Sequence, residues 1–245
     1  MGCLCLHGFT ASPHEVLWLA QHLGQQGYTV YTPRLAGHGT NPRDLARVRW
    51  SDWLNSALDA YYVLRQQCDQ VYVCGLSMGA LVGLLVSLHV PVDGVVVMAA
   101  PLKFEGVVQP RVLRVVKYLR PWTDQADRSP FEQYIREQQQ QRGEPVLGRV
   151  RYGTWSTAAL EQGARMSAEV VRRLPEIDVP VLALYSEKDK TVDTGSLQIL
   201  QAKMNNQKLE FYVFKRSDHI LTQDMEYAEV FQRVAAFIAA QIAGK

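Results

Sequence analysis

Residues 71–79 have the sequence VYVCGLSMG, an apolar run followed by a turn of small residues. The run 71–74 predicts a strand, and the small and aliphatic residues at 78–89 predict a buried helix directly after it. The pentapeptide between them fits G-x-S-x-G, in the strand–turn–helix context that exposes a reactive serine, here Ser77. Flanking glycines allow the close approach and strained backbone of such a turn. The alternative is that Ser77 only caps the helix.

The alternation of strand and helix extends in both directions from this segment. Short apolar runs recur along the chain, and segments with helical spacing separate them. This order predicts an α/β fold with a mainly parallel sheet of six or seven strands and helices on both faces. Strands are expected at 3–6, 28–32, 71–74, 95–99, 181–185 and 209–214, and helices at 14–26, 51–67 (capped by Ser51), 78–89, 194–204 and 225–242.

The alternation breaks at residues 102–178, where the strand signal disappears and the sequence predicts helices and loops. Gln138–Gln141 is expected on the solvated face of one of these helices. A segment of this length between two strands is too long for a simple connection. We therefore predict a helical cap at 102–178, inserted into a core formed by 1–101 and 179–245.

Composition and charge limit the function further. The chain has 245 residues, 47% apolar and 20% charged, with a formal charge of +2, so nothing favours a nucleic-acid partner. No apolar run approaches the roughly 18 residues of a membrane span, and the N-terminus does not resemble a signal peptide, so we expect a cytoplasmic protein without stable membrane insertion. The sequence is compatible with a monomer or a homodimer and does not decide between them. The cysteines have no zinc-site spacing and are expected to be small buried side chains: Cys3, Cys5, Cys68 and Cys74.

A serine hydroxyl is a weak nucleophile and needs a general base. In folds of this type the residues follow one another as serine, acid and histidine. Only His89 and His219 follow Ser77, and His89 would lie about 18 Å along the helix that Ser77 begins. His219 comes after the last predicted strand, at the edge of a parallel sheet where ligands usually bind. We therefore predict His219 as the base.

The acid that orients His219 should lie between the serine and the histidine in the chain. Asp189 follows the predicted strand 181–185 and is the first choice, since it could accept the histidine Nδ1–H. Glu187 and Asp193 in the same loop are rivals. Asp218 is less favoured, because adjacent side chains usually diverge.

An oxyanion hole needs two backbone N–H donors near the serine. Met78, directly after the serine, supplies one. Phe9 supplies the other if the loop His7–Thr10 follows the first strand to the site; the alternative is an ordinary turn. Two motifs are set aside: His14-Glu15 lacks the second histidine of a zinc-protease helix, and Gly37-His38-Gly39 lacks the residues of a phosphate loop. No cofactor or metal is expected.

Several of these motifs together resemble one family. The loop His7–Thr10, the segment Pro33–Thr40, Asp52-Trp53 and Gly75–Gly79 are similar to those of bacterial monoacylglycerol lipases and small thermophilic carboxylesterases. The resemblance extends to the Asp-x-x-Val loop at 189–192 and the Ser-x-His segment at 217–219, and it fades in 102–178.

The resemblance implies an α/β-hydrolase fold and cofactor-free hydrolysis of short- to medium-chain acyl esters through an acyl-enzyme on Ser77. A thioesterase, amidase, C–C hydrolase or perhydrolase with the same three residues is the first alternative, and a catalytically silent binding protein the second. A helical cap would wall an apolar acyl pocket, although packing between cap and core explains its apolar residues equally well. The substrate-binding candidates are Phe9, Met78, Leu102, Phe104, Val107, Val108 and Trp155.

Overall fold

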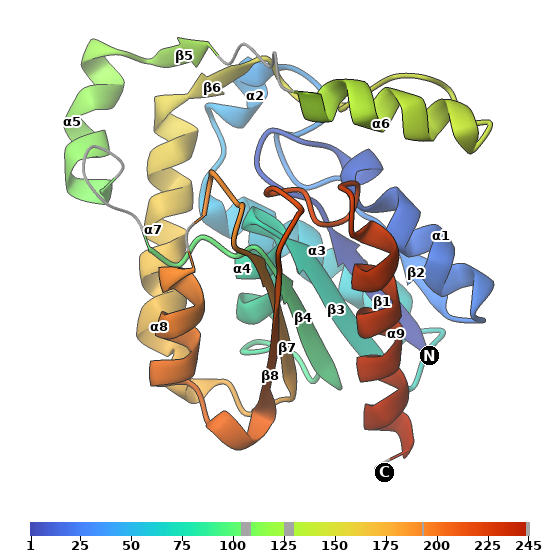
Figure 1. The fold of residues 1–245 in the computed structure, drawn as a ribbon. Coiled ribbons are helices and arrows are strands. Elements are labelled where there is room, and N and C mark those ends of the chain that lie inside the picture. Colours follow the sequence, from blue (N-terminus) through green and yellow to red (C-terminus); the bar gives the residue numbers. More distant parts are fainter. Residues whose placement is uncertain (104–108, 125–129, 193, 244–245) are drawn as a thin grey trace.

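The computed structural model describes the chain except for residues 104–108, 125–129, 193 and 244–245. Its centre is a six-stranded sheet with strand order β2-β1-β3-β4-β7-β8, in which every neighbouring pair is parallel (Figure 1). The predicted fold class is confirmed, and each predicted strand is present with small shifts at its ends. The strands are β1 (Gly2–Leu6), β2 (Thr29–Tyr31), β3 (Val71–Leu76), β4 (Gly94–Met98), β7 (Val181–Ser186) and β8 (Leu209–Phe214).

The sheet separates two apolar cores, because successive side chains of a strand point to opposite faces. In β1, Leu4 and Leu6 enter one core, whereas Cys3 and Cys5 enter the other. Both faces are covered by helices, as expected for a parallel sheet. The first core includes α3 (Trp50–Arg65), α4 (Met78–Val86) and α8 (Gly195–Lys203), and the second includes α1 (Leu17–Gln25) and α9 (Tyr227–Ala243).

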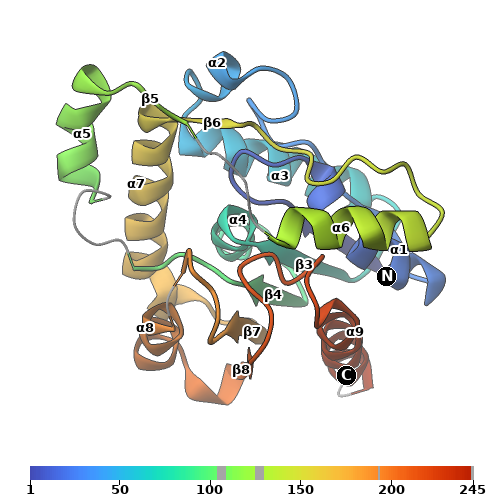
Figure 2. The same ribbon diagram turned by 45° about the horizontal axis from the view of Figure 1, so that its top comes forward.

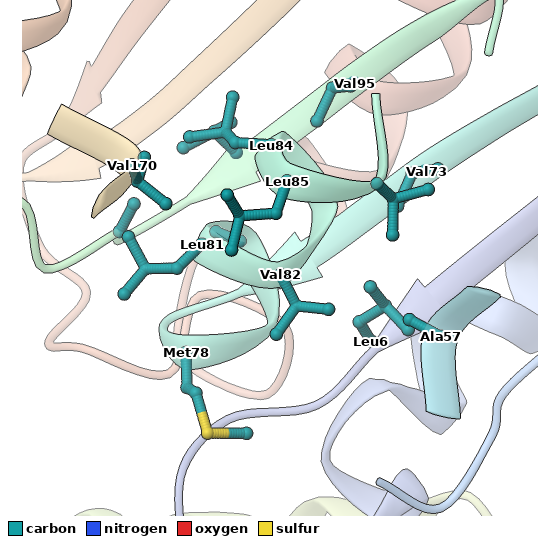
Figure 3. Packing of buried hydrophobic residues seen from close by; sticks show 14 of the residues in the cluster. Leu6, Ala57, Val73, Met78, Leu81, Val82, Leu84, Leu85, Val95 and Val170 are labelled. Carbon is teal, nitrogen blue, oxygen red and sulfur yellow. The ribbon is translucent and has the colours of Figure 1, made fainter. Parts of the chain in front are cut away.

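Helix α4 is buried along its whole length. Figure 3 shows its leucine and valine side chains packed among those of neighbouring elements, including Val73 of β3 and Val95 of β4. Gly83 faces these two strands, since a Cβ built on it would lie 3.1 Å from Val73 Cγ1. This close packing fixes the N-terminus of α4, which carries Ser77, against the end of β3.

The predicted start of helix α3 is wrong. Ser51 does not cap α3: the helix begins at Trp50, and the Arg49 N–H donates to the Asp52 carboxylate at 2.8 Å. A carboxylate three residues into the helix thus replaces the serine.

Within the described residues, no helix is both long and apolar enough to cross a bilayer. The shorter helices are α2 (Pro42–Leu45) and the 3-10 turns Pro13–Val16, Leu174–Glu176 and Asn206–Lys208.

Residues 102–178, called here the cap segment, lie between β4 and β7 and extend beyond the sheet (Figures 1 and 2). The prediction of helices and loops alone is wrong, because β5 and β6 pair as a small antiparallel sheet. Each of these strands has three residues with a single tryptophan between or beside polar side chains, so neither shows an apolar run in the sequence. The segment contains α5 (Pro110–Leu119), β5 (Trp122–Asp124), α6 (Pro130–Gln141), β6 (Thr154–Ser156) and α7 (Thr157–Arg173).

The glutamine run ends α6, and one of its side chains contradicts the predicted solvated face. Gln139 is fully buried. Its amide oxygen accepts from the N–H groups of Leu147 and Gly148, and its amide nitrogen donates to the Gly148 carbonyl. Through these hydrogen bonds the Gln139 side chain holds residues 142–150 folded back along α6. The neighbouring Gln140 and Gln141 are exposed as predicted.

Candidate active site

The predicted site residues lie close together at the carboxyl edge of the sheet, in or beside the loops that follow four of the strands. Ser77 follows β3, Asp189 follows β7, and His219 follows β8. The loop after β1 brings Gly8 beside Ser77, since a Cβ built on Gly8 would lie 3.4 Å from the serine Cβ. Parallel strands converge at this edge, so residues distant in sequence become neighbours.

Ser77 occupies a strained turn between β3 and α4. Its φ of 54° and ψ of −116° lie where side chains are rarely tolerated, and its N–H is fixed by a 2.7 Å bond to the Met98 carbonyl. A Cβ on Gly75 would come within 2.2 Å of the Gly79 carbonyl oxygen, and one on Gly79 within 2.3 Å of the Leu6 oxygen. Only glycine fits at either position, which explains the spacing of the pentapeptide.

Ser77, His219 and Asp189 form one hydrogen-bonded chain. His219 Nε2 lies 2.9 Å from Ser77 Oγ, and His219 Nδ1 lies 2.8 Å from Asp189 Oδ2. The Asp189 side chain is fully buried, and the His219 side chain is 13% exposed. The other oxygen of Asp189 accepts from the N–H groups of Thr191 and Val192, both at 2.8 Å, so the carboxylate is held from both ends.

The rival acids differ in their surroundings. Glu187 is exposed on the same loop. Asp218 uses its Oδ1 to accept from the backbone N–H groups of His219 and Lys190, rather than from the histidine ring. Asp193 lies outside the described residues. His89 is distant from the serine in the chain, and its Nδ1 bonds to the Leu85 carbonyl in its own helix.

The loop that carries His219 is held by a residue that sequence reasoning missed. Glu226 accepts from the N–H groups of Arg216 and Ser217 and from the Ser217 hydroxyl. Burial alone would raise the pKa of Glu226, but the hydrogen bonds from Ser217 and the neighbouring backbone outweigh burial and lower it. The bonds therefore favour the charged form. The only sequence signal was an acid shortly after the Ser-x-His segment.

The loop after β1 is held by Glu15, which the sequence suggested only as part of a rejected zinc motif. The Gly8 N–H donates to Glu15 Oε2 at 2.8 Å, and Glu15 itself is buried. Thr10 has a φ of 64°, so the loop leaves the strand through a strained turn. Because the Gly8 N–H is already bonded, it cannot serve an anion beside Ser77. Phe9 and Met78 stay the predicted donors, and Met78 is the first residue of α4, whose N–H has no partner within the helix.

The cap segment contacts this loop through two residues that were not predicted. Arg149 Nη2 lies 3.3 Å from Glu15 Oε1, in a largely buried ion pair. The Tyr152 N–H donates to the Thr10 carbonyl at 2.9 Å, and its hydroxyl donates to the Gly37 carbonyl at 2.8 Å. The cap segment is thus bonded to the loop beside Ser77.

Aromatic side chains surround the Phe9 ring. Trp155 of β6, Trp53 of α3 and His38 each meet the ring edge-to-face, with centroids 5.8, 6.1 and 6.2 Å away. Leu102 and the Met78 side chain are buried in the first apolar core. This burial favours a packing role over a place in the pocket wall for both side chains. The predicted pocket residues Phe104, Val107 and Val108 lie outside the described residues.

The two histidines near this cluster are buried and structural in their contacts. His7 Nε2 accepts from the Leu35 N–H, and its Nδ1 donates to the Gly8 carbonyl. His38 bonds through Nδ1 to the Ala36 carbonyl, and burial together with the neighbouring His7 lowers its pKa to about 3. Within the described part of the chain, no group of histidine, cysteine and acidic side chains is arranged to hold a metal ion.

Comparison with known families agrees with this geometry. Residues 2–226 match the hydrolase family described as serine aminopeptidase, S33. The chain belongs to this family. The resemblance inferred from the sequence motifs is confirmed by two relatives of nearly equal length. A thermostable monoacylglycerol lipase from Bacillus sp. (strain H-257) is 29% identical over 98% of this chain and 90% of its own. A carboxylesterase from Bacillus subtilis (strain 168) is 29% identical over 96% of this chain and 91% of its own.

Solved structures agree on the fold. A structure from a study of LipS and LipT, two metagenome-derived lipolytic enzymes, superposes with a TM-score of 0.85 at 25% identity, covering 98% of this chain and 93% of that one. The monoacylglycerol lipase of Paleococcus ferrophilus superposes with a TM-score of 0.77 at 13% identity, covering 98% and 94%. The second likeness supports the α/β-hydrolase fold alone.

Proposed function

We propose that the protein hydrolyses carboxylic esters, with Ser77 as nucleophile, His219 as base and Asp189 as the acid that orients the histidine. The hydrogen-bonded chain of 2.9 and 2.8 Å from Ser77 through His219 to Asp189 is the observation that supports this proposal most strongly. The names of the two Bacillus relatives, a monoacylglycerol lipase and a carboxylesterase, favour an ester over an amide substrate. The proposed hydrolysis needs no cofactor.

The chemistry would proceed in two halves. Ser77 Oγ attacks the ester carbonyl carbon while His219 Nε2 takes the serine proton. The tetrahedral adduct collapses, the C–O bond to the alcohol breaks, and His219 returns the proton to the departing alcohol. A water molecule then attacks the acyl-serine in the same way and releases the carboxylic acid. Asp189 stabilises the imidazolium in both halves and keeps the histidine ring in the productive orientation.

The negative oxygen of the adduct would be bound by the N–H groups of Phe9 and Met78. The position of Gly8 against Ser77 and the strained turn at Thr10 support this assignment, since both bring the loop close to the nucleophile. One such donor contributes roughly 3–4 kcal/mol of transition-state stabilisation. The strained backbone at Ser77 also supports its role as nucleophile, because strain of this kind is typical of active sites and the Ser77 Oγ lies 2.9 Å from His219 Nε2.

The cap segment, residues 102–178, would act as a separate unit that covers the acyl chain, with 1–101 and 179–245 as the hydrolase core. The contact between Phe9 and Trp155 supports an apolar wall at this boundary. We expect short- to medium-chain acyl groups to be preferred. The substrate is a small acyl ester, and monomeric and homodimeric forms are both compatible with this chemistry.

A cytoplasmic location belongs to the same proposal. Cys3, Cys5, Cys68 and Cys74 are free and buried, as in proteins of a reducing compartment. Fractionation of the cells that produce the protein would test this part separately.

The test combines turnover with labelling. The purified chain is assayed with p-nitrophenyl esters of increasing acyl length and incubated with a serine-directed phosphonate, and the labelled peptide is identified by mass spectrometry. We expect turnover of the shorter esters and a single adduct on Ser77, both lost in Ser77→Ala. Absence of turnover together with an unlabelled Ser77 would contradict the proposal.

Matched substrates distinguish the alternatives within the family. A thioester and an aminoacyl p-nitroanilide are assayed beside the oxygen ester, because the family description names an aminopeptidase. A much higher kcat/KM for either one would replace the ester assignment while keeping the same catalytic residues. A silent binding protein would react with none of the three substrates.

A further inference from the structure

Helix α5 packs against the rest of the molecule by only one side. Leu113 is buried, and the Lys117 ammonium donates to the buried Glu161 carboxylate of α7 at 2.7 Å. Figures 1 and 2 both show α5 at the outer rim of the molecule, with α7 between it and the sheet. The opposite side of the helix therefore faces solvent.

That outer side carries large apolar side chains. Val115 is 61% exposed, Tyr118 80% and Leu119 81%, and Val112 and Trp122 are also exposed. Positions 112, 115 and 119 have helical spacing of three and four residues, so they share one face with Tyr118 beside them. Such a contiguous apolar face on a folded protein usually marks a surface that binds something.

The same surface is strongly basic. Residues 109–124, which run from the residue before α5 to the end of β5, contain four basic side chains, Arg111, Arg114, Lys117 and Arg120, and one acidic side chain, the exposed Asp124. The three arginines are exposed and flank the apolar face, whereas Lys117 is used internally. The face thus combines aliphatic and aromatic groups with positive charge, which is the composition of helices that lie in a lipid interface.

We propose that α5 binds the surface of an anionic lipid bilayer. Val112, Val115 and Leu119 enter the boundary between headgroups and acyl chains, Tyr118 and Trp122 lie at headgroup level, and the arginines bind lipid phosphates. This is peripheral binding by a surface helix and needs no membrane span. It goes beyond the ester chemistry and does not depend on it.

Charge argues against a second copy of the chain as the occupant. A twofold contact between two α5 faces would bring Arg111, Arg114 and Arg120 of one copy beside the same residues of the other. Like charges at a desolvated contact are costly, whereas an anionic bilayer neutralises them. The observations therefore favour lipid over self-association.

The docked helix is connected to the candidate active site. Helix α5 packs on α7, which directly follows β6, and β6 carries the Trp155 ring that meets Phe9. A bilayer bound at α5 would thus lie on the cap side of the site. Lipid-derived molecules leaving the bilayer would meet this side first.

Vesicle flotation of the full chain tests the proposal. Phosphatidylcholine vesicles are compared with vesicles in which about one third of the lipid is phosphatidylglycerol, at low and high salt. We expect binding to the anionic vesicles, at least tenfold weaker binding to the neutral ones, and a marked loss at high salt. No binding of the unmodified chain to anionic vesicles would overturn the proposal.

Paired variants locate the surface. Val115→Glu with Leu119→Glu should abolish flotation, and the matched control, Tyr62→Glu with Val63→Glu on the exposed side of α3, should not. Circular dichroism checks that both fold, and Arg111→Gln with Arg114→Gln, which leaves the apolar face intact, should lose the preference for anionic lipid. Equal binding by all variants would overturn the proposal, as would a dimer in solution that the α5 variant converts to a monomer.

Discussion

At the residue scale, Asp189 illustrates how a carboxylate is selected from several in one loop. Its Oδ2 faces His219, while its Oδ1 is fixed by the N–H groups of Thr191 and Val192. Glu187 lies two residues earlier but extends into solvent. The choice therefore depends on the turn that follows β7, and sequence order alone could not make it.

Substituting Asp189 by Asn should cost most of the activity while leaving the fold intact. The amide keeps the shape but offers no charge to the imidazolium and favours the wrong histidine tautomer. We expect kcat to fall by about four orders of magnitude, as in comparable serine proteases, with little change in KM. Steady-state kinetics on a p-nitrophenyl ester measures both parameters.

Glu187→Gln is the control, because it removes a carboxylate from the same loop without touching His219. It should retain activity within a few-fold. A similar loss in Asp218→Ala would mean instead that the bonds from the His219 and Lys190 N–H groups to the Asp218 carboxylate, and not the ring contact of Asp189, determine the histidine position.

At the element scale, most of the sheet could be predicted from the sequence because its central strands are buried on both faces. Four of the parallel strands, β1, β3, β4 and β7, are buried along their whole length and read as continuous apolar runs. The small sheet in the cap segment could not be predicted, because each of its strands has three residues of which two are polar, so neither forms an apolar run. The role of Gln139 also escaped, since a buried amide bonded to backbone resembles a solvated glutamine in sequence.

The candidate site likewise contains residues that could be predicted from the sequence and residues that could not. Ser77 and His219 could be predicted because a motif and the order along the chain restrict them. Glu15, Arg149 and Tyr152 could not, because their partners lie far away in sequence and depend on how the cap segment docks. Contacts of this kind leave no local pattern.

Glu15 couples two elements, the loop after β1 and the cap segment, and its loss should slow the chemistry. In Glu15→Ala the Gly8 N–H loses its acceptor and Arg149 loses its ion pair, so the loop beside Ser77 is free to shift. We expect kcat to fall by about tenfold to a hundredfold, less than for removal of an oxyanion donor, with KM nearly unchanged. The Gln variant keeps an acceptor for Gly8 and should recover part of the rate.

Glu144→Ala provides the matched control for this prediction. Glu144 also joins the cap segment to the core, because its Oε2 accepts from Trp18 Nε1 of α1. Its Oε1 accepts from Arg142 within the cap segment, so neither side-chain bond involves the loop beside Ser77. If both alanine variants lose kcat equally, general attachment of the cap segment, and not the position of Gly8, sets the rate.

At the scale of the whole molecule, buried neutral histidines link folding to pH. Burial, aided by His7, lowers the pKa of His38 to about 3, and burial also lowers the pKa of His7. In the unfolded chain both take up protons below their ordinary value near 6.5, whereas folded His38 stays neutral until about 3. The unfolded state thus binds more protons in this window, so stability is full above about pH 6.5 and falls as the pH decreases.

The His38→Phe variant separates this effect from the many carboxylates that titrate at lower pH. Its ring can keep the contacts with Phe9 and Trp53, although the bond to Ala36 is lost. Between about pH 8 and pH 5, the free energy of unfolding of the original chain should fall by about 2 kcal/mol more than that of the variant. Urea unfolding at both pH values measures the difference, in which the constant cost of the lost bond cancels. An equal fall in both proteins would mean that His38 is protonated in the folded state, which its burial between two aromatic rings and His7 argues against.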